Sequence, residues 1–532
     1  MNKMTRKLIL CTVACIALWA CQTSTTAPTA GVSVELQNPV LPGFHPDPSV
    51  VAVGEDYYLV NSSFHYFPGV PIFHSRDLQN WEQIGNVLDR PSQLPLKSAT
   101  SWLGIYAPTI RYNDGTYYMI TTLVGEVEDA ASSAANGNFM VTATNPAGPW
   151  SEPIYLEQQG IDPSLYFEDG KCYMVSNPDG VITLCEIDPA TGATLSPGKE
   201  LWRGTGGRFP EGPHVYKKDG WYYLLISEGG TEMAHKLTVA RSKNIYGPYE
   251  SNPANPIFTH CSAAAQNSNI QGTGHGDLFQ AADGSWWIVM LAYRRFGGDF
   301  HHLGRETFLA PVTWENDWPV INGGKPLAEK MTVRMPSAPK AVPSRDRHYT
   351  FSEAPGPEWM HVQAPVYSNY AFTKDGLVLH GNGESLGWGS EHPTALLRRQ
   401  EAAEVTLSTT VKLHGNADAG LAVYQIFSGY ATLGLCRSDL RLEAVLRYQV
   451  RSIDKEVRTQ LPLWESSACL EIRAYGDHYE FWVNGRELGR LDSALLSTEV
   501  VGGFTGVTMG PYCTKGMASF PELRYLERIE NE

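Results

Sequence analysis

Cysteines and long apolar segments, which cross-link a chain or anchor it in a membrane, are scarce in this 532-residue sequence. Only nine residues are cysteine, and three of these, Cys11, Cys15 and Cys21, lie in the N-terminal leader. The other six are scattered without C-x-x-C spacing, which argues against a zinc site or a disulfide-built fold. No segment after the leader reaches the roughly 20 apolar residues of a membrane-spanning helix. A disulfide between Cys172 and Cys185 stays open, because the leader predicts export.

Basic residues are also scarce, since 41 lysines and arginines stand against 56 aspartates and glutamates. The resulting net charge of −15 repels phosphate backbones, so we predict no nucleic-acid partner. Apolar residues make up 42% of the chain, which excludes a disordered protein. The 26 tyrosines, 14 tryptophans and 50 glycines favour a β-rich protein that contacts sugars or other rings. The length favours two domains.

The N-terminus has the pattern of a secretory signal. Basic residues among the first seven are followed by an apolar run from Leu8 to Ala20 that is too short to span a bilayer. It ends in Leu18-Trp19-Ala20-Cys21, which resembles the bacterial lipoprotein box, where Cys21 would carry the lipid. We therefore predict a signal at 1–21 and a flexible tether at 22–34. The protein would be an outer-membrane lipoprotein facing the periplasm, touching the membrane only through Cys21, or a periplasmic protein released by ordinary cleavage.

One pattern recurs five times in the first 330 residues. Each copy has apolar residues, a polar turn and an aromatic-rich strand, and four of the five turns contain Asp-Gly, a strong hairpin signal. The copies cover residues 51–58, 110–118, 165–173, 215–223 and 278–287. Their spacing leaves room for four short strands in each copy, the size of a propeller blade. The pattern predicts a five-bladed β-propeller over residues 35–330; a β-sandwich with similar hairpins is the alternative.

A proline-rich stretch at 331–347 predicts a linker. Beyond it, alternating segments such as 405–411 and 479–483 recur, and Asn484-Gly485 is typical of a hairpin turn. We predict that residues 348–532 form a second all-β domain, a jelly-roll or concanavalin-like sandwich. The fold class is therefore all-β.

The repeats also predict where functional side chains gather. About ten residues before each aromatic pair lies the start of the first strand of a blade, and these strands line the central channel. The residues at this position are Asp47, Ala107, Asp162, Glu211 and His275. A single Asp before Pro is usually a turn residue. Three carboxylates at matching positions repel one another, which indicates a function.

Cleavage of a glycosidic bond needs one carboxylic acid that protonates the leaving oxygen and one carboxylate that acts at the anomeric carbon. A neighbouring negative charge keeps the acid protonated by raising its pKa. The longer side chain of Glu211 suits the acid, and Asp47 and Asp162 are short and lie beside prolines. The residues alone leave open which aspartate is the base.

Five segments together resemble glycoside hydrolase family 43. They are residues 38–49, 161–164, 211–214, 272–277 and 304–308. The resemblance extends through the mature chain, including Leu396-Leu397-Arg398-Arg399-Gln400, and is to the branch of β-xylosidases and α-L-arabinofuranosidases with a C-terminal sandwich. It implies that Asp47 is the general base, Glu211 the general acid, and Asp162 the residue that tunes the pKa of the acid. The family inverts the anomeric configuration, which implies a water molecule between Asp47 and the sugar.

The resemblance also implies supporting residues. Arg305 would bind a sugar hydroxyl, or else pair with Glu306 at the surface. Phe64 and Tyr106 would be pocket walls, or ordinary blade packing; many relatives have Trp in place of Tyr106. Phe504, from the sandwich, would close the pocket.

His275 resembles a histidine that, directly or through water, contacts a calcium ion in some members; a structural role stays open. No organic cofactor is implied.

The sequence therefore predicts a hydrolase that releases xylose from the non-reducing ends of β-1,4-xylo-oligosaccharides. An α-L-arabinofuranosidase, or an enzyme with both activities, is the alternative, and a non-catalytic sugar-binding propeller is a third hypothesis. The natural oligosaccharide, the membrane face and the oligomeric state stay open.

Overall fold

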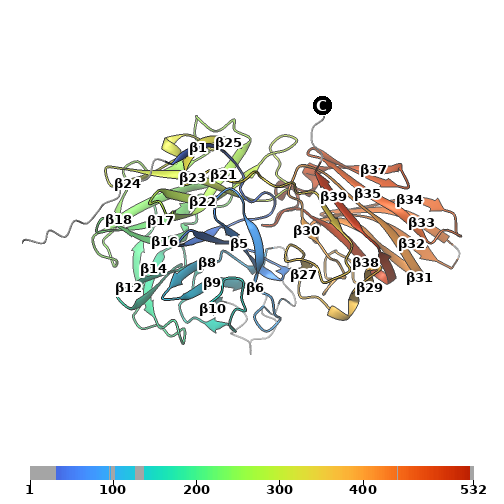
Figure 1. Ribbon diagram of the computed structural model, residues 1–532, viewed down its shortest axis with the longest axis horizontal. Coiled ribbons are helices and arrows are strands. Elements are labelled where there is room, and N and C mark those ends of the chain that lie inside the picture. Colours follow the sequence, from blue (N-terminus) through green and yellow to red (C-terminus); the bar gives the residue numbers. More distant parts are fainter. Residues whose placement is uncertain (1–30, 95, 97–101, 126–136, 440, 528–532) are drawn as a thin grey trace, which may run out of the picture.

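The computed structural model describes residues 31–94, 96, 102–125, 137–439 and 441–527, which form two all-β domains. Figure 1 shows the first domain in blue to yellow and the second in orange to red. The predicted signal, the lipidation site Cys21 and most of the predicted tether lie outside the described residues. Among the described residues, none of the helices is both long enough and apolar enough to cross a membrane.

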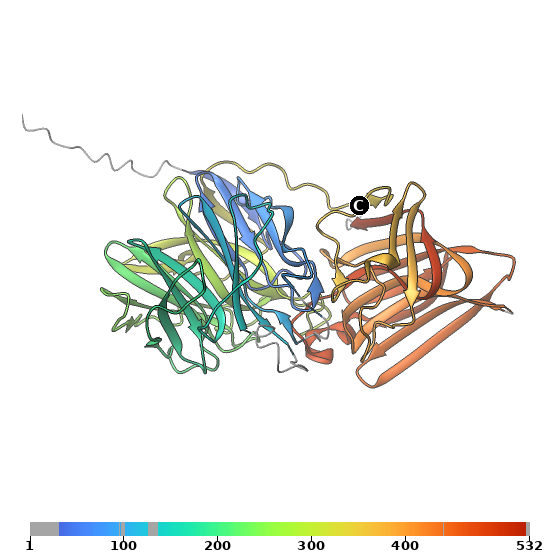
Figure 2. The ribbon, with the colours of Figure 1, turned by 90° about the horizontal axis from the view of Figure 1, so that it is seen from below.

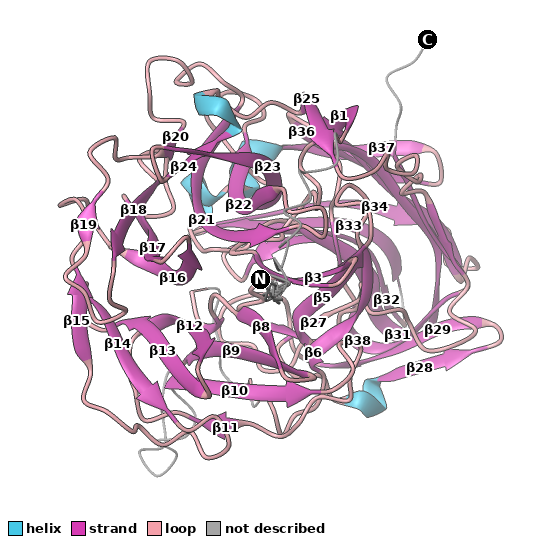
Figure 3. Ribbon diagram, turned by 60° about the vertical axis from the view of Figure 1, so that its left-hand side comes forward, coloured by secondary structure: helices cyan, strands magenta, loops and turns pink. Residues whose placement is uncertain are grey.

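The first domain is a five-bladed β-propeller, which confirms the prediction (Figure 3). Within each blade the strands are antiparallel. The blade strands are β2 (Ser49–Val53), β3 (Asp56–Val60), β5 (Gly69–Ser75) and β6 (Glu82–Leu88); β7 (Gly104–Ile105), β8 (Thr109–Asn113), β9 (Thr116–Val124), β10 (Gly137–Ala143) and β11 (Ile154–Tyr155); β12 (Ile161–Glu168), β13 (Lys171–Asn177), β14 (Ile182–Ile187) and β15 (Lys199–Trp202); β16 (Glu211–Lys218), β17 (Trp221–Glu228), β18 (Lys236–Ser242), β19 (Glu250–Ser251) and β20 (Phe258–Thr259); and β21 (Ile270–Gln280), β22 (Trp286–Arg294), β23 (Glu306–Glu315) and β24 (Trp318–Ile321).

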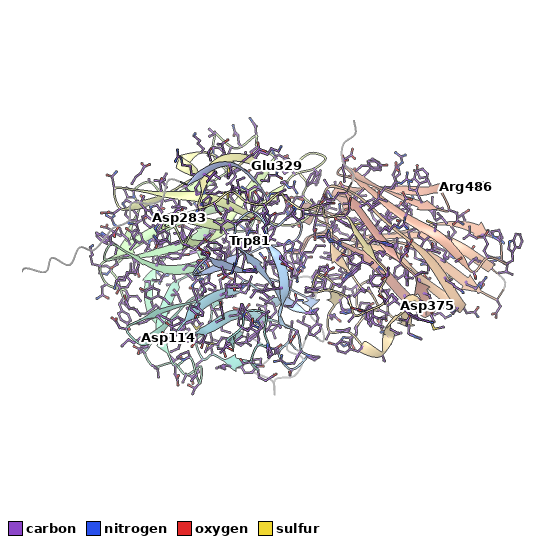
Figure 4. All side chains as sticks on the ribbon, in the orientation of Figure 1. Trp81, Asp114, Asp283, Glu329, Asp375 and Arg486 are labelled. Carbon is purple, nitrogen blue, oxygen red and sulfur yellow. The ribbon has the colours of Figure 1, made fainter. Side chains whose placement is uncertain are left out.

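The repeated pattern of the sequence forms the hairpin between the first two long strands of each blade. Asp114 lies in the turn between β8 and β9, and Asp283 lies in the turn between β21 and β22 (Figure 4). Asp114, Asp169 and Asp219 have φ values of 46°, 51° and 51°, the left-handed backbone that such tight turns require. The aromatic residues after each turn pack between neighbouring blades, as Tyr58 does against Tyr117.

One strand pair corrects the predicted domain boundaries. β1 (Val32–Gln37) pairs antiparallel with β25 (Lys330–Met335), so residues 32–34 and 331–335 belong to a sheet rather than to the tether and the linker. β25 alternates buried and exposed residues. The first proline of the predicted linker is Pro336, directly after this strand. The partners lie about 300 residues apart in sequence, so no local turn signal reveals the pair. It draws the start of the propeller chain to its end.

The second domain is the predicted concanavalin-like sandwich. Its long strands follow the order β28-β29-β38-β31-β32-β33-β34, with the other strands paired off this path. The strands are β26 (Arg347–Tyr349), β28 (Tyr370–Thr373), β29 (Gly376–Asn382), β30 (Arg398–Arg399), β31 (Glu404–Ile426), β32 (Gly429–Ser438), β33 (Arg441–Val450), β34 (Ile453–Leu461), β35 (Ser467–Tyr475), β36 (His478–Val483), β37 (Arg486–Asp492), β38 (Thr508–Phe520) and β39 (Leu523–Glu527). The sandwich also has the short helices η2 (Tyr367–Asn369), η3 (Ser493–Leu496) and α1 (Thr498–Val501). The short helix η1 (Asn322–Gly324) belongs to the propeller, where it follows β24.

The two domains share a strand pairing and a hydrophobic core. β4 (Tyr66–Phe67) of the propeller pairs with β27 (His361–Val362), which follows the linker. Phe44 and Phe64 pack in one buried cluster with sandwich residues such as Leu397 and Tyr424. Burial of one such side chain contributes about 1.5–3 kcal/mol, so the cluster fixes the sandwich against the propeller. Figure 2 shows the sandwich lying against one side of the propeller.

The cysteines form no cross-link among the described residues. Cys172 and Cys185 lie in neighbouring strands β13 and β14, and both are buried free thiols. The disulfide that the sequence left open is therefore not formed.

Candidate active site

The predicted carboxylates sit where the innermost strands begin, in backbone that bends sharply. Asp47, Asp162 and His275 have φ values of 50°, 54° and 43°, which are uncommon for residues other than glycine. The pairing of β12, β16 and β21 with the next strand shifts register at this position. Such bulges and strained residues gather at functional sites because they re-aim side chains. In blade 2 the matching residue is Ala107, which contributes no polar side chain.

Asp47 is buried and held on both oxygens. Ser62 donates a hydrogen bond to Oδ2 over 2.5 Å, and Arg305 Nη1 donates one to Oδ1 over 2.8 Å. His275 Nδ1 lies 3.7 Å from the same Oδ1. Burial alone would raise the pKa of Asp47, but the charge of Arg305, the nearby His275 and the Ser62 hydrogen bond together lower it. Asp47 is therefore ionised and can accept a proton.

Glu211 has the opposite electrostatics. Burial is the largest cause that raises its pKa well above the ordinary value, and the charges of Asp162 and Asp47 raise it further. Asp162 accepts a hydrogen bond from the Gly212 backbone N–H over 3.0 Å, directly beside Glu211. Burial also raises the pKa of Asp162. Glu211 can therefore stay protonated near neutral pH, as a general acid must.

A buried histidine that the sequence did not single out faces Glu211. His235 Nε2 lies 3.8 Å from Glu211 Oε1 and has no hydrogen-bond partner among the described residues, while Nδ1 lies 3.2 Å from the Gly272 carbonyl. Burial lowers the pKa of His235 to about 3, so the ring is neutral. A Cβ at Gly274 would lie 2.3 Å from the His235 ring, so only glycine fits there. His235 lies outside the five repeat positions, and no sequence signal marks it.

Aromatic side chains from both domains form one wall of the site. Phe64 stacks on Phe504 with ring centroids 5.5 Å apart, and Tyr106 lies 5.5 Å from Phe64 and 6.0 Å from Phe504. Trp102, which the sequence did not single out, meets Phe504 edge-on at 4.9 Å. Phe64 has a φ of 48°, a strained backbone of the kind that functional sites retain. The structure thus brings Phe64, Tyr106 and Phe504 together, and their contact with substrate stays a prediction.

Phe504 reaches the propeller because its loop is bonded to blade 5. The Val507 N–H donates to the His302 carbonyl over 2.9 Å, and Gly506 lies against Leu303 and Gly304 so closely that a Cβ on either glycine would overlap backbone. The sandwich therefore contributes Phe504 to the aromatic cluster beside the carboxylates.

Arg305 joins these parts. Besides Asp47, Nη1 donates to Thr231 Oγ1 over 3.2 Å, and Nη2 donates to the Phe504 carbonyl over 3.3 Å. The alternative that Arg305 pairs with Glu306 is wrong, because Glu306 pairs with Arg294 over 2.7 Å. Arg305 is 6% exposed, so it is no surface cation.

A buried polar network lies behind the carboxylates. Asp277, in β21, accepts hydrogen bonds from Ser49 Oγ over 2.6 Å, Tyr216 OH over 2.6 Å and Arg111 Nη1 over 2.8 Å. Burial alone would raise the pKa of Asp277, but Arg111 and the hydrogen bonds bring it far below the ordinary value. These residues belong to blades 1, 2, 4 and 5, so the network ties the inner strands together.

The donors near His275 do not suit direct calcium binding. Calcium takes six to eight oxygen ligands. The described residues contain no group of three or more His, Cys, Asp or Glu that could hold a metal ion. Contact between His275 and a calcium ion through water therefore stays a prediction.

An ionised aspartate, a protonated glutamate and a third carboxylate at one end of a five-bladed propeller define a glycoside hydrolase site. The family model of glycosyl hydrolases family 43 matches residues 36–319, and that of the β-xylosidase C-terminal concanavalin A-like domain matches residues 348–525. The chain belongs to glycoside hydrolase family 43.

Named relatives match over nearly the full length. A non-reducing end α-L-arabinofuranosidase of Bacteroides ovatus is 38% identical over 518 residues, 94% of each chain. A xylosidase/arabinosidase of Butyrivibrio fibrisolvens is 39% identical over 510 residues, 90% of this chain and 95% of the relative. The crystal structure of a xylan β-1,4-xylosidase from Bacillus halodurans has a TM-score of 0.84 and 34% identity, covering 92% of this chain and 100% of that one.

Proposed function

We propose that this enzyme releases xylose from the non-reducing ends of β-1,4-xylo-oligosaccharides. The observation that carries the proposal is the opposite shift of two pKa values, lowered at Asp47 and raised at Glu211. Two titratable groups with separated pKa values are the pattern of an acid and a base. The names of the xylosidase relatives support the substrate class.

In the proposed mechanism Glu211 protonates the glycosidic oxygen while Asp47 takes a proton from a water molecule. That water attacks the anomeric carbon from the opposite face, so the configuration inverts. Asp162 holds the Gly212 N–H and supplies the negative charge that keeps Glu211 protonated. Each proton transfer contributes about 10²–10⁴-fold in rate. We infer that the Phe504 wall closes one end of the substrate site, which would favour attack at chain ends, and that Arg305 binds a sugar hydroxyl.

Substitution of the acid tests catalysis itself. Glu211→Ala should lower kcat by about 10²–10⁴-fold, and less for aryl glycosides whose leaving groups need no proton. Glu232→Ala is the matched control, because Glu232 is an exposed glutamate whose ion pair, within the described part of the chain, is with Arg208 at 3.7 Å. Unchanged turnover in Glu211→Ala would mean that a contaminating enzyme supplies the activity, and would support the third hypothesis, a non-catalytic sugar-binding propeller.

An α-L-arabinofuranosidase, alone or with both activities, is the second candidate. The name of the Bacteroides ovatus relative favours it. The two sugars differ in ring form, and an enzyme with both activities would have to accept both forms in one pocket. Assays of aryl β-xyloside beside aryl α-L-arabinofuranoside separate the activities. A kcat/KM that is much larger on the arabinofuranoside would reverse the order of the candidates.

We also propose that His275 contacts a calcium ion only through water. An ion there would stiffen the channel, and no proton transfer would pass through it. The test compares the unfolding temperature with calcium and with a chelator, in the wild type and in His275→Ala. A calcium-dependent rise that His275→Ala removes supports the proposal, and identical melting in all samples overturns it.

We propose export through the leader and a lipid on Cys21, which makes the protein an outer-membrane lipoprotein facing the periplasm. A protein released into the periplasm is the alternative. Fractionation of cells that express the wild type or Cys21→Ala distinguishes them. A membrane-bound wild type and a soluble variant support the anchor, and a wild type in the periplasmic fraction overturns it.

A further inference from the structure

A cavity of about 800 Å³ lies at the junction of the two domains, separate from the active site. None of the three carboxylates of the active site lines it. Phe73 and Trp81 of blade 1 contribute to one side, and Tyr349 and Arg399 of the sandwich contribute to the other (Figure 4 labels Trp81). The volume is within the range of sites for small molecules, about 300–1,000 Å³.

Arg399 is a buried cation in the lining of the cavity, and its guanidinium lies 5.5 Å from the centroid of the Phe44 ring. Its side chain is 6% exposed, and Nε donates a hydrogen bond to the Phe44 carbonyl over 2.6 Å. Within the described part of the chain, Arg399 has no ion pair, and neither Nη donates a hydrogen bond to protein. Burial lowers its pKa from the ordinary value to about 10. A buried cation without an ion-pair partner is costly, so its retention needs a reason.

The neighbouring acids are already occupied. Glu401 pairs with Arg398 over 3.0 Å and also faces Arg345 at 4.0 Å. Asp77 accepts hydrogen bonds from the Asn80 and Lys340 backbone N–H groups over 2.8 and 3.0 Å. The charge of Glu401 still acts on Arg399, but among the described residues no acid lies within ion-pair distance of the Arg399 guanidinium.

The lining as a whole is cationic. Six basic residues line the cavity against four acidic ones, although the chain carries a net charge of −15. The basic residues are Arg76, Lys340, Arg345, Arg347, Arg398 and Arg399, and the acidic ones are Asp77, Glu82, Glu358 and Glu401. A local excess of positive charge on an acidic protein favours an anionic ligand.

We propose that this cavity binds a small sugar acid, whose carboxylate is held by the two Nη nitrogens of Arg399. A planar guanidinium matches a carboxylate with two parallel hydrogen bonds. The cavity is much larger than a single ion, and Phe73, Trp81 and Tyr349 add aromatic side chains to its lining, which suits a ring-shaped ligand. His45, which also lines it, is neutral, because burial and Arg399 lower its pKa well below the ordinary value. The site is independent of the proposed xylosidase activity.

Calorimetric titration of the full chain with D-glucuronate, D-glucose and inorganic phosphate tests the site. The wild type should bind glucuronate at least about tenfold more tightly than glucose, and Arg399→Gln should weaken glucuronate binding by about tenfold or more. Arg399→Lys should bind with intermediate affinity, since it keeps the charge but loses the fork. Arg203→Gln is the matched control, because Arg203 is exposed, lies outside the cavity lining and pairs with Glu200 over 2.6 Å, and it should bind like the wild type.

Three results would overturn the proposal. They are equal binding of glucuronate and glucose, tighter binding of phosphate than of glucuronate, and glucuronate binding that Arg399→Gln leaves unchanged. If Arg399→Gln fails to fold, a crystal of the wild-type protein soaked in glucuronate decides the question. Glucuronate on Arg399 supports the site, and a cavity without it at about 10 mM contradicts it.

Discussion

Arg305 Nη1 lies 2.8 Å from Asp47 Oδ1, while Nη2 of the same guanidinium bonds to the Phe504 carbonyl of the other domain. One buried cation therefore sets the charge state of an active-site carboxylate and holds the sandwich loop above it. Arg305 therefore affects both the position of the sandwich loop and the pKa of Asp47.

Arg305→Gln should shift the acid limb of the pH–activity profile to higher pH. Arg305 lowers the pKa of Asp47, and the base must be ionised, so activity is lost as the pH falls through this pKa. Removal of the cation raises the pKa and moves that loss upward. The measurement is kcat/KM against pH, with Arg305→Lys as the charge-preserving control. An acid limb that stays in place would show that Arg305 acts only on the substrate.

Asp162→Asn should shift the alkaline limb to lower pH. Glu211 must be protonated, so activity falls as the pH rises through its pKa, which the charge of Asp162 helps to raise. Asparagine keeps the shape of the side chain but removes that charge. The same pH profile measures the effect, and kcat at the optimum should fall about 10-fold or more. A shift toward higher pH would contradict the assigned role.

Phe504→Ala should raise KM for xylobiose and lower kcat/KM by about tenfold, because the stacked pair with Phe64 is lost. The unfolding temperature should change little, since Phe504 lies in a loop whose backbone bonds remain. Phe427→Ala, which removes an aromatic ring that packs on exposed Trp388, is the control. Equal kinetics in the two variants would show that Phe504 does not line the substrate site.

Asp277→Ala should destabilise the propeller by about 3–5 kcal/mol, because it leaves buried Arg111 without its partner. Folding depresses the pKa of Asp277, so its contribution is fully present above the unfolded pKa of about 3.9 and is lost as the pH falls toward the folded pKa. The stability difference from wild type should therefore shrink below about pH 4. Chemical unfolding at several pH values measures it. The control is Asp114→Asn, at a hairpin turn, whose free energy of unfolding should match that of the wild type. A loss of less than about 1 kcal/mol of unfolding free energy in Asp277→Ala would contradict the account.

The repeats explain how much of the site could be predicted. The sequence can single out Asp47, Asp162 and Glu211 because five blades place equivalent strand starts around one axis, so a position in the repeat is a position in space. In blade 4 the positive φ falls on Gly212, at 60°, where blades 1 and 3 have it on Asp47 and Asp162, so Glu211 stands one residue earlier in its blade than the two aspartates do in theirs.

Other parts had no such signal. His235 and Trp102 reach the site from loop and strand ends outside the repeated pattern, so only the packed structure places them there. The β1–β25 pair joins segments from opposite ends of the propeller, and short edge strands carry little local pattern. The alternation of apolar and polar residues in β25 can be seen in the sequence, but nothing in the sequence identifies β1 as its partner.

The stereochemistry of the first product tests the central claim most directly, that Asp47 and Glu211 act as an inverting base and acid around one anomeric carbon. Proton NMR of xylo-oligosaccharide hydrolysis follows the anomeric signals before mutarotation mixes them. The account predicts that xylose first appears as the α-anomer and is released one unit at a time. Initial β-xylose, or longer products from within the chain, would contradict it.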